Sequence, residues 1–463
     1  MNKLLFMIAT AAVGVSFMAC ESKLDIVPKG QTTLDRTEEL EMLLNKSYDF
    51  QTTPSDLGMI PNVWLSFALN VSNMLQQQNS LNYVQLTYDE SVDRIPLCVT
   101  DARYNSIYKY INTMNVIVEQ APESTGDDAL KRQIVAEARV MRAYLHFLIA
   151  NMHAAQYDDT TAATLGGIAY VTDTNLGEVK QKLTLQETYS RMLEDCSEEV
   201  IADLPRYVND VNRADQAFGN AVRAKILFQM KHYAEAIPYA RRTLDINGHI
   251  EDRSVVASTR VWSMPRQSEN NYVFMSATFT MLPYMVVASR ETSQLFDPND
   301  YVCKYEASGG WSETSGQMFG GISGVKCCVC TGAQENVYGI KAESVYYLLA
   351  ECLIRMGEID EGLSFVDRVR ESRIEDCAAF SGTVSTEKEA MQLLERAKIV
   401  EFIATCEPFF DFRRWNSETD YRRTITRDLG EFGTYSLSPD SPLWILPFPA
   451  EATRLNPTLT QNF

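Results

Sequence analysis

IKAESVYYLLAECLIRMGEIDEGLSFVDRVRESR, residues 340–373, carries the strongest fold signal in the chain. Its apolar side chains recur at helical spacing on both sides of Gly357, a glycine placed where a helix is expected to end. Ala350 and Gly362, one on each predicted helix, lie twelve residues apart and would let two antiparallel helices approach closely. The stretch therefore predicts a helical hairpin of the tetratricopeptide type, which cannot bury its apolar face without partner hairpins.

A second hairpin is predicted at residues 216–246. Ala224 and Ala236 repeat the twelve-residue spacing, and Tyr233 takes the position of Ile359 just after the turn. This echo indicates a repeat architecture. We expect a helical-hairpin scaffold, with two irregular insertions of the kind that usually carry function. The scaffold covers residues 34–50, 101–153, 185–246 and 340–405, and the insertions cover residues 51–100 and 249–339.

The first 33 residues have the composition of a targeting segment followed by a tether. Lys3 precedes an apolar run from Leu4 to Val15, and a small residue stands directly before Cys20. We predict a lipoprotein signal peptide over residues 1–19, lipidation of Cys20, and an extended tether over residues 20–33. Ordinary secretion, with Cys20 incidental, is the alternative. No other stretch approaches the roughly 20 continuous apolar residues that a membrane span requires, so a lipid is the predicted anchor.

Composition argues against several classes of function. The formal net charge is −19, and the basic residues are scattered without a patch interleaved with aromatics, which disfavours nucleic-acid binding. Cys327 and Cys330 have the two-residue gap of a zinc knuckle, but no histidine and no second close cysteine pair completes a site. We predict neither a metal site nor a cofactor.

The sequence has no signature of an enzyme. It contains no Gly-x-Ser-x-Gly, no His-Glu-x-x-His and no phosphate-binding glycine loop. Of its four histidines, His146 and His153 share one predicted helix face, where packing or solvent contact is favoured over metal binding. Pairs among the 61 acidic residues could be chosen almost anywhere, so their presence carries no information about glycoside hydrolysis. We therefore predict no catalytic residues.

Several stretches resemble, in order, the SusD/RagB family of surface lipoproteins from Bacteroidetes. The resemblance covers nearly the whole chain. The matching stretches are Cys20 with Leu24-Asp25 and Pro28, Tyr104–Ile111 with Asn112 and Asn115, Ala136–Arg139 with Arg142-Ala143-Tyr144, Gly166-Gly167-Ile168, Leu348–Gly357, Glu395-Arg396, Phe410–Trp415, and Asn456-Pro457 with Gln461-Asn462. The chain departs from the family at Phe296–Val302, which lacks the arginine usual there, and at Glu407-Pro408, where a glutamate-glycine is usual. The residues before Cys20 are a loose version of the lipobox.

The resemblance implies a mainly α, SusD-like fold. Tetratricopeptide-like hairpins would pack against an irregular, loop-rich region with few short strands, in a single domain over residues 34–463. It also implies a non-enzymatic lipoprotein, exposed on the outer membrane, that captures oligosaccharides and delivers them to a SusC-type TonB-dependent transporter. Two alternatives stay open: a RagB-like importer subunit that binds peptides, and a helical-repeat scaffold that binds other proteins.

Sugar capture needs flat aromatic faces with polar groups beside them. The candidates in the two insertions are Trp64, Tyr83, Tyr284 and Trp311 for the aromatic platform, and Gln78 and Asn79 for polar contacts. Each aromatic alone is more often a core residue than a ligand platform, because large aromatics dominate protein cores. We expect at least one of Trp64, Tyr83 and Trp311 to contact the ligand.

Two charged motifs belong to the family-like stretches. Glu137 lies beside Arg139 and Arg142, and Asp411 lies beside Arg413 and Arg414. Either motif could contact a ligand, but structural ion-pair networks commonly use the same residue types. We predict that both motifs form structural ion pairs that fix helices and loops.

Overall fold

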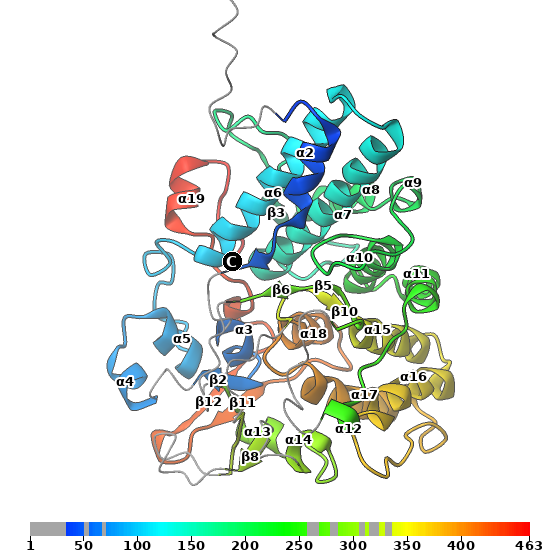
Figure 1. The fold of residues 1–463 in the computed structure, drawn as a ribbon. Helices are drawn as coiled ribbons and strands as arrows, with labels where there is room; N and C mark the ends of the chain where they lie inside the picture. Colours follow the sequence, from blue (N-terminus) through cyan, green and yellow to red (C-terminus); the bar gives the residue numbers. More distant parts are fainter. Residues whose placement is uncertain are drawn as a thin grey trace, which may run out of the picture.

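Figure 1 shows the computed structural model, in which helices form an arc from the top to the lower right and short elements occupy the lower left. The structure describes residues 34–50, 55–66, 71–256, 268–277, 286–304, 311–313, 324–328 and 336–463. The predicted fold class is confirmed: helical hairpins pack against a loop-rich region whose strands are short. In the described ranges, no helix has the length and apolar character needed to cross a membrane.

The stretch around Gly357 folds into two antiparallel helices, as predicted. Helix α15 is Ala342–Arg355 and helix α16 is Ile359–Glu371. Gly357 has a φ of +88°, in the left-handed region that ends many helices. A Cβ atom built on Gly362 would come within 2.7 Å of the Ala350 carbonyl oxygen, so the close approach of the two helices requires glycine there.

Substitution of Gly357 by alanine is expected to lower the free energy of unfolding by about 1 kcal/mol, because an L side chain rarely adopts this φ. The added Cβ would have no atom within 4 Å, so the cost comes from the backbone alone. Gly177→Ala is the matched control, since Gly177 has no positive φ and its added Cβ would make one ordinary contact. Denaturant midpoints should fall for Gly357→Ala only, and equal shifts would contradict this account.

The second predicted helical hairpin is present. Helices α10 (Gln216–Gln229) and α11 (Tyr233–Ile246) form a second hairpin, and α11 lies beside α15 in Figure 1. The other helices of the scaffold are α2 (Thr37–Glu41), α6 (Ala102–Gln120), α7 (Asp128–His153), α8 (Leu185–Asp195), α9 (Glu198–Ala202), α17 (Glu387–Glu401) and α18 (Glu407–Asn416).

The two histidines of α7 pack in the core and have no contact with solvent. His146 and His153 are both fully buried. Burial lowers the pKa of His146 to about 3, so the ring is neutral at physiological pH. Its Nε2 accepts a hydrogen bond of 3.0 Å from the backbone N–H of Val171, and the His153 ring stacks on Phe448. Both rings therefore tie α7 to neighbouring loops.

The loop-rich region combines short helices with a four-stranded sheet. The sheet has the order β2-β7-β9-β8, and β11 and β12 form a separate antiparallel ribbon beside it. Its elements are α3 (Ser55–Met59), β2 (Trp64–Ser66), α4 (Val71–Gln76), α5 (Leu81–Thr87), α12 (Arg253–Val256), β7 (Val286–Ala288), α13 (Arg290–Ser293), α14 (Tyr301–Lys304), β8 (Trp311–Glu313), β9 (Lys326–Cys328), β11 (Ile425–Asp428) and β12 (Thr434–Leu437).

Three two-stranded pairings join the loops to the scaffold. Two of them are antiparallel, and the third is parallel. They pair β1 (Tyr48–Asp49) with β6 (Met275–Ser276), β5 (Asn271–Val273) with β10 (Ile340–Lys341), and β3 (Gly166–Ala169) with β4 (Lys182–Thr184). The C-terminal tail contains a short helix, α19 (Ala450–Leu455).

Candidate functional site

The four-stranded sheet brings together two of the predicted platform residues, Trp64 on β2 and Trp311 on β8. Both indoles are buried, with exposed fractions of 1% and 0%. The expectation that they form an exposed platform is therefore wrong for this structure. Tyr284, the third predicted aromatic, lies outside the described residues.

Strand alternation explains why both tryptophans are buried. Leu65, Val287 and Cys327 are paired across the sheet, and Trp64 and Trp311 each stand one residue away from that row. Because successive side chains of a strand point to opposite faces, both indoles share the other face. That face contributes to the main core, whereas Val287 and Cys327 belong to a smaller core on the opposite side.

Local packing holds the two rings in place. A Cβ atom on Gly58 would clash with the Trp64 indole, so the glycine of α3 leaves room for that ring. The Trp311 ring lies 5.5 Å from the ring of Phe296, centroid to centroid. Both tryptophans are thus core residues that pack between the four-stranded sheet and the main core.

The remaining candidates, Gln78, Asn79 and Tyr83, lie together between α4 and the start of α5. We call residues Gln77–Ser80 with Tyr83 the α4–α5 tip. Gln78 and Asn79 are exposed, and Tyr83 is half-buried at the start of α5. The Ser80 hydroxyl caps α5, accepting from the Tyr83 N–H at 3.2 Å and donating to the Gln77 carbonyl at 2.8 Å. The cap fixes the tip so that an aromatic ring and two amides share one short segment.

A buried arginine that we did not predict from the sequence anchors this segment. Arg427 on β11 donates to the carbonyl oxygens of Gln85 at 2.7 Å and Leu86 at 2.5 Å, and to that of Met59. Its guanidinium also lies 4.3 Å from the centre of the Tyr88 ring. Burial lowers the pKa of Arg427, and its hydrogen-bond acceptors are neutral groups. Nothing in the polar stretch around Arg427 signals this role.

Asn62 completes the anchor. Its Oδ1 accepts from Arg427 Nε at 3.0 Å, and its Nδ2 donates to the Glu291 carboxylate at 2.9 Å. The same Nδ2 reaches the Thr426 carbonyl at 3.0 Å. Together, Asn62 and Arg427 link α3, α5, α13 and β11. We call these two residues the Arg427 anchor.

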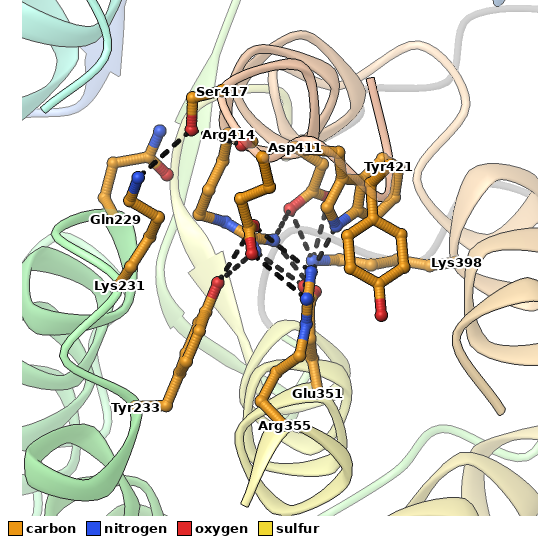
Figure 2. A network of polar contacts seen from close by, with 12 residues as sticks. Gln229, Lys231, Tyr233, Glu351, Arg355, Lys398, Asp411, Arg414, Ser417 and Tyr421 are labelled. Atoms are coloured by element: carbon orange, nitrogen blue, oxygen red, sulfur yellow. Dashed lines mark hydrogen bonds and ion pairs between the residues drawn. The ribbon is translucent and has the colours of Figure 1, made fainter. Parts of the chain in front are cut away.

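The second charged motif forms a buried network, shown in Figure 2. Arg414 of α18 donates to both oxygens of Glu351 on α15, at 2.6 and 2.8 Å, and to Asp411 at 3.0 Å. Lys398 of α17 holds the other oxygen of Asp411 at 2.8 Å, and Tyr233 of α11 accepts from Arg414 at 3.2 Å. Four helices therefore meet on one set of charges, which fits the predicted structural role.

The first charged motif is also paired within the protein. Arg142 of α7 donates to both oxygens of Asp195 at 2.7 Å, and Arg139 reaches the same carboxylate at 3.1 Å. Glu137 accepts from Arg213 at 2.6 and 2.7 Å. These groups fasten α7 to α8 and to the loop before α10.

In the ranges that the structure describes, no group of three or more histidine, cysteine, aspartate or glutamate side chains could hold a metal ion. Cys327 is buried in β9 and packs in the smaller core. Cys330, which follows Cys327 at the two-residue gap, lies outside the described residues.

Residues 23–227 match a family model, SusD-like, described as starch-binding and associating with the outer membrane. No curated protein sequence matches the chain at a significant level. Similar solved structures, in contrast, extend over nearly the whole chain.

A SusD superfamily protein from Bacteroides thetaiotaomicron has a TM-score of 0.72 at 15% identity, covering 92% of this chain and 100% of that one. A putative sugar binding protein from Bacteroides vulgatus has a TM-score of 0.68 at 11% identity, covering 93% and 99%. A SusD-like carbohydrate binding protein from Bacteroides fragilis has a TM-score of 0.64 at 14% identity, covering 93% and 100%. At these identities the likeness establishes a SusD-like fold, and the SusD-like family model matches residues 23–227 of the chain.

Proposed function

We propose that this protein is a non-enzymatic lipoprotein that captures oligosaccharides and delivers them to a SusC-type TonB-dependent transporter. The observation that carries the proposal is the likeness to sugar-binding relatives over more than 90% of the chain, together with the family description of starch binding at the outer membrane. The inference to ligand class rests on fold and family, and the site residues add the chemistry.

The α4–α5 tip is the proposed ligand contact. Tyr83 is the one predicted platform aromatic that the described structure leaves partly accessible, and the amides of Gln78 and Asn79 are exposed beside it. An aromatic face can stack on the C–H surface of a sugar while planar amides donate to and accept from its hydroxyls. The tip offers both kinds of group within one short segment.

Anchoring through Cys20 is part of the same proposal. A lipidated Cys20 would leave thirteen residues, 21–33, between the membrane and the first described residue, Leu34. A chain of that length spans at most about 45 Å when extended. Such a tether would hold the binding face close to a transporter in the same membrane.

Tyr83→Ala is expected to weaken oligosaccharide binding at least about fivefold, which corresponds to roughly 1 kcal/mol. Loss of the ring removes the stacking face, whereas Ser80 still caps α5. A glycan array with residues 21–463 would identify the ligand, and isothermal titration would compare the variants. Tyr207→Ala is the matched control, because Tyr207 is an exposed tyrosine at 56% and lies outside the tip.

The alternatives predict different results. Binding of peptides with no binding of any oligosaccharide would overturn the glycan proposal and favour a peptide importer. An affinity pull-down from the native outer membrane that recovered other surface proteins, and no barrel transporter, would favour a scaffold. Turnover of a labelled glycan would contradict the non-enzymatic role.

A further inference from the structure

A cavity of about 80 Å³ lies where α12, α15, α16 and α17 meet the segment that precedes α14, on the opposite side of the loop-rich region from the α4–α5 tip. Its lining combines arginines and carboxylates with a comparable number of apolar and aromatic side chains. The residues that matter here are Arg253, Asp300, Tyr347, Arg373, Arg396 and Glu401. Arg396 is exposed, so the cavity has an edge near solvent.

Arg253 is a buried cation with too few partners. Its side chain is 3% exposed. The guanidinium makes one long hydrogen bond of 3.4 Å, from Nη2 to Glu401 Oε1, and the same Nη2 forms an ion pair of 3.3 Å with Glu401 Oε2. Its Nε has no acceptor among the described residues. A guanidinium has five N–H donors, so most of the donor capacity of Arg253 is unused although the group is withdrawn from water.

Arg373, next to it, is fully used. It donates to Glu401 at 2.9 Å, to Glu343 at 2.7 Å and to the Glu251 carbonyl at 2.5 Å. Glu401 also pairs with Lys341 at 3.2 Å. Because Glu401 already serves two other cations, it cannot satisfy Arg253, and the unsatisfied donors beside a cavity indicate a missing acceptor.

Asp300 is the under-used acid of the same cavity. Its side chain is 3% exposed, and its Oδ1 accepts from the Val302 N–H at 2.9 Å. No cation of the described structure lies within ion-pair distance of it. Burial is the main cause that raises the pKa of Asp300 to about 6, and the negative charge of Glu401 also raises it. The positive charges of Arg253 and Arg373 lower the pKa and partly offset this shift. The carboxyl is therefore able to carry a proton under mildly acidic conditions.

We propose that this cavity binds a carboxylate group, which Arg253 holds through two N–H donors while protonated Asp300 donates a third hydrogen bond. The forked geometry of a guanidinium matches a carboxylate. With Asp300 neutral, the buried groups Arg253, Arg373 and Lys341 outnumber Glu343 and Glu401 by one positive charge, and a carboxylate restores balance. The other charged lining residues cancel, because Arg370 pairs with Asp367 and the half-buried Asp297 offsets the exposed Arg396. The ligand is either a small carboxylate or the carboxylate end of a larger molecule, such as a uronic acid or the C-terminus of a peptide.

The size of the cavity favours such a group. A volume of about 80 Å³ exceeds the roughly 10–15 Å³ that one water molecule needs, and it admits a carboxylate with one or two attached carbons. The exposed guanidinium of Arg396 attracts anions to the edge in an otherwise acidic protein. The proposal does not depend on the proposed oligosaccharide capture, since it concerns other residues.

Isothermal titration of residues 21–463 with sodium acetate, sodium glucuronate and glycylglycine tests the proposal, with acetamide and glucose as uncharged controls. Binding of at least one carboxylate at pH 5.5, roughly tenfold weaker at pH 7.5, is the expected result, because Asp300 loses its proton between these values. Tighter binding of glucuronate than glycylglycine assigns a sugar acid, and the reverse order assigns a peptide C-terminus. No saturable binding of any carboxylate overturns the site.

Two variants separate ligand binding from folding. Arg253→Met should lose at least tenfold in carboxylate affinity, whereas Arg242→Met, which removes an exposed arginine paired with Glu198, should bind like the wild type. Asp300→Asn keeps a donor at neutral pH, so it should bind with little difference between pH 5.5 and 7.5. If Arg253→Met does not fold, the Asp300→Asn profile decides: a pH dependence equal to that of the wild type overturns the proposal.

Discussion

Glu351→Ala is expected to lower the free energy of unfolding by about 3–5 kcal/mol, because it leaves buried cations without their carboxylate. Arg414 and Glu351 are both completely buried and joined by two hydrogen bonds (Figure 2). Arg355 also pairs with Glu351, at 3.5 Å, and the Trp415 indole donates to it at 2.9 Å. The loss should appear as a lower midpoint in chemical denaturation.

The control for Glu351 is an exposed glutamate. Glu361 pairs with Arg241 at 2.6 Å, but both side chains are more than 40% exposed. Such pairs contribute little, so Glu361→Ala should cost about 0.5 kcal/mol or less. Equal losses for the two variants would contradict a structural role for the buried network.

The pH dependence gives a second measurement of the Glu351 contribution. Burial raises the pKa of Glu351, but Arg414, Lys398 and Arg355 outweigh it and lower the pKa from its ordinary 4.5 to about 2. The pKa is lower in the folded state, so the stabilisation is complete above pH 4.5 and is lost as the pH falls toward 2. The difference between wild type and Glu351→Ala should therefore shrink in acid.

The scaffold could be predicted because its signals are local. Helical spacing around Gly357, and the small residues Ala350 and Gly362, specify a hairpin within a single stretch. The same holds for the charged motif at Asp411 and Arg414, whose structural role follows from composition. Its partner Glu351 could not be named, because the contact joins residues 63 positions apart and any acidic residue was equally eligible.

The burial of the tryptophans could not be predicted, because it depends on long-range pairing. In the sheet, β2 pairs with β7, β7 with β9, and β9 with β8. Trp64 and Trp311 therefore lie on the same face only because segments far apart in the sequence pair with one another. Each of these strands has three residues, too few to show the alternation that reveals an inward face. An aromatic in an irregular stretch is therefore compatible with a platform or a core, and only the sheet register decides.

Arg427→Met is expected to release the segment 55–88 and to lower the free energy of unfolding by about 3 kcal/mol or more. The substitution removes the Arg427 donor from the carbonyl oxygens of Gln85 and Leu86, and it leaves that of Met59 with the Asn62 N–H and the Tyr88 hydroxyl alone. Because α5 carries Tyr83, release of this helix should also weaken any ligand bound at the α4–α5 tip. Hydrogen exchange followed by mass spectrometry should show faster exchange in peptides that cover residues 55–88.

Arg422→Met provides the comparison for Arg427. Arg422 lies five residues earlier, and its ion pair with Asp440 is exposed, at 41% and 76% for the two side chains. Its removal should leave exchange at residues 55–88 unchanged, since an exposed pair supports no buried carbonyl. Arg427→Lys should fall closer to Arg427→Met than to the wild type, because an ammonium group cannot reach several carbonyls and the Asn62 amide at once. Unchanged exchange in Arg427→Met would show that the helices α3 and α5 hold their places through apolar packing alone.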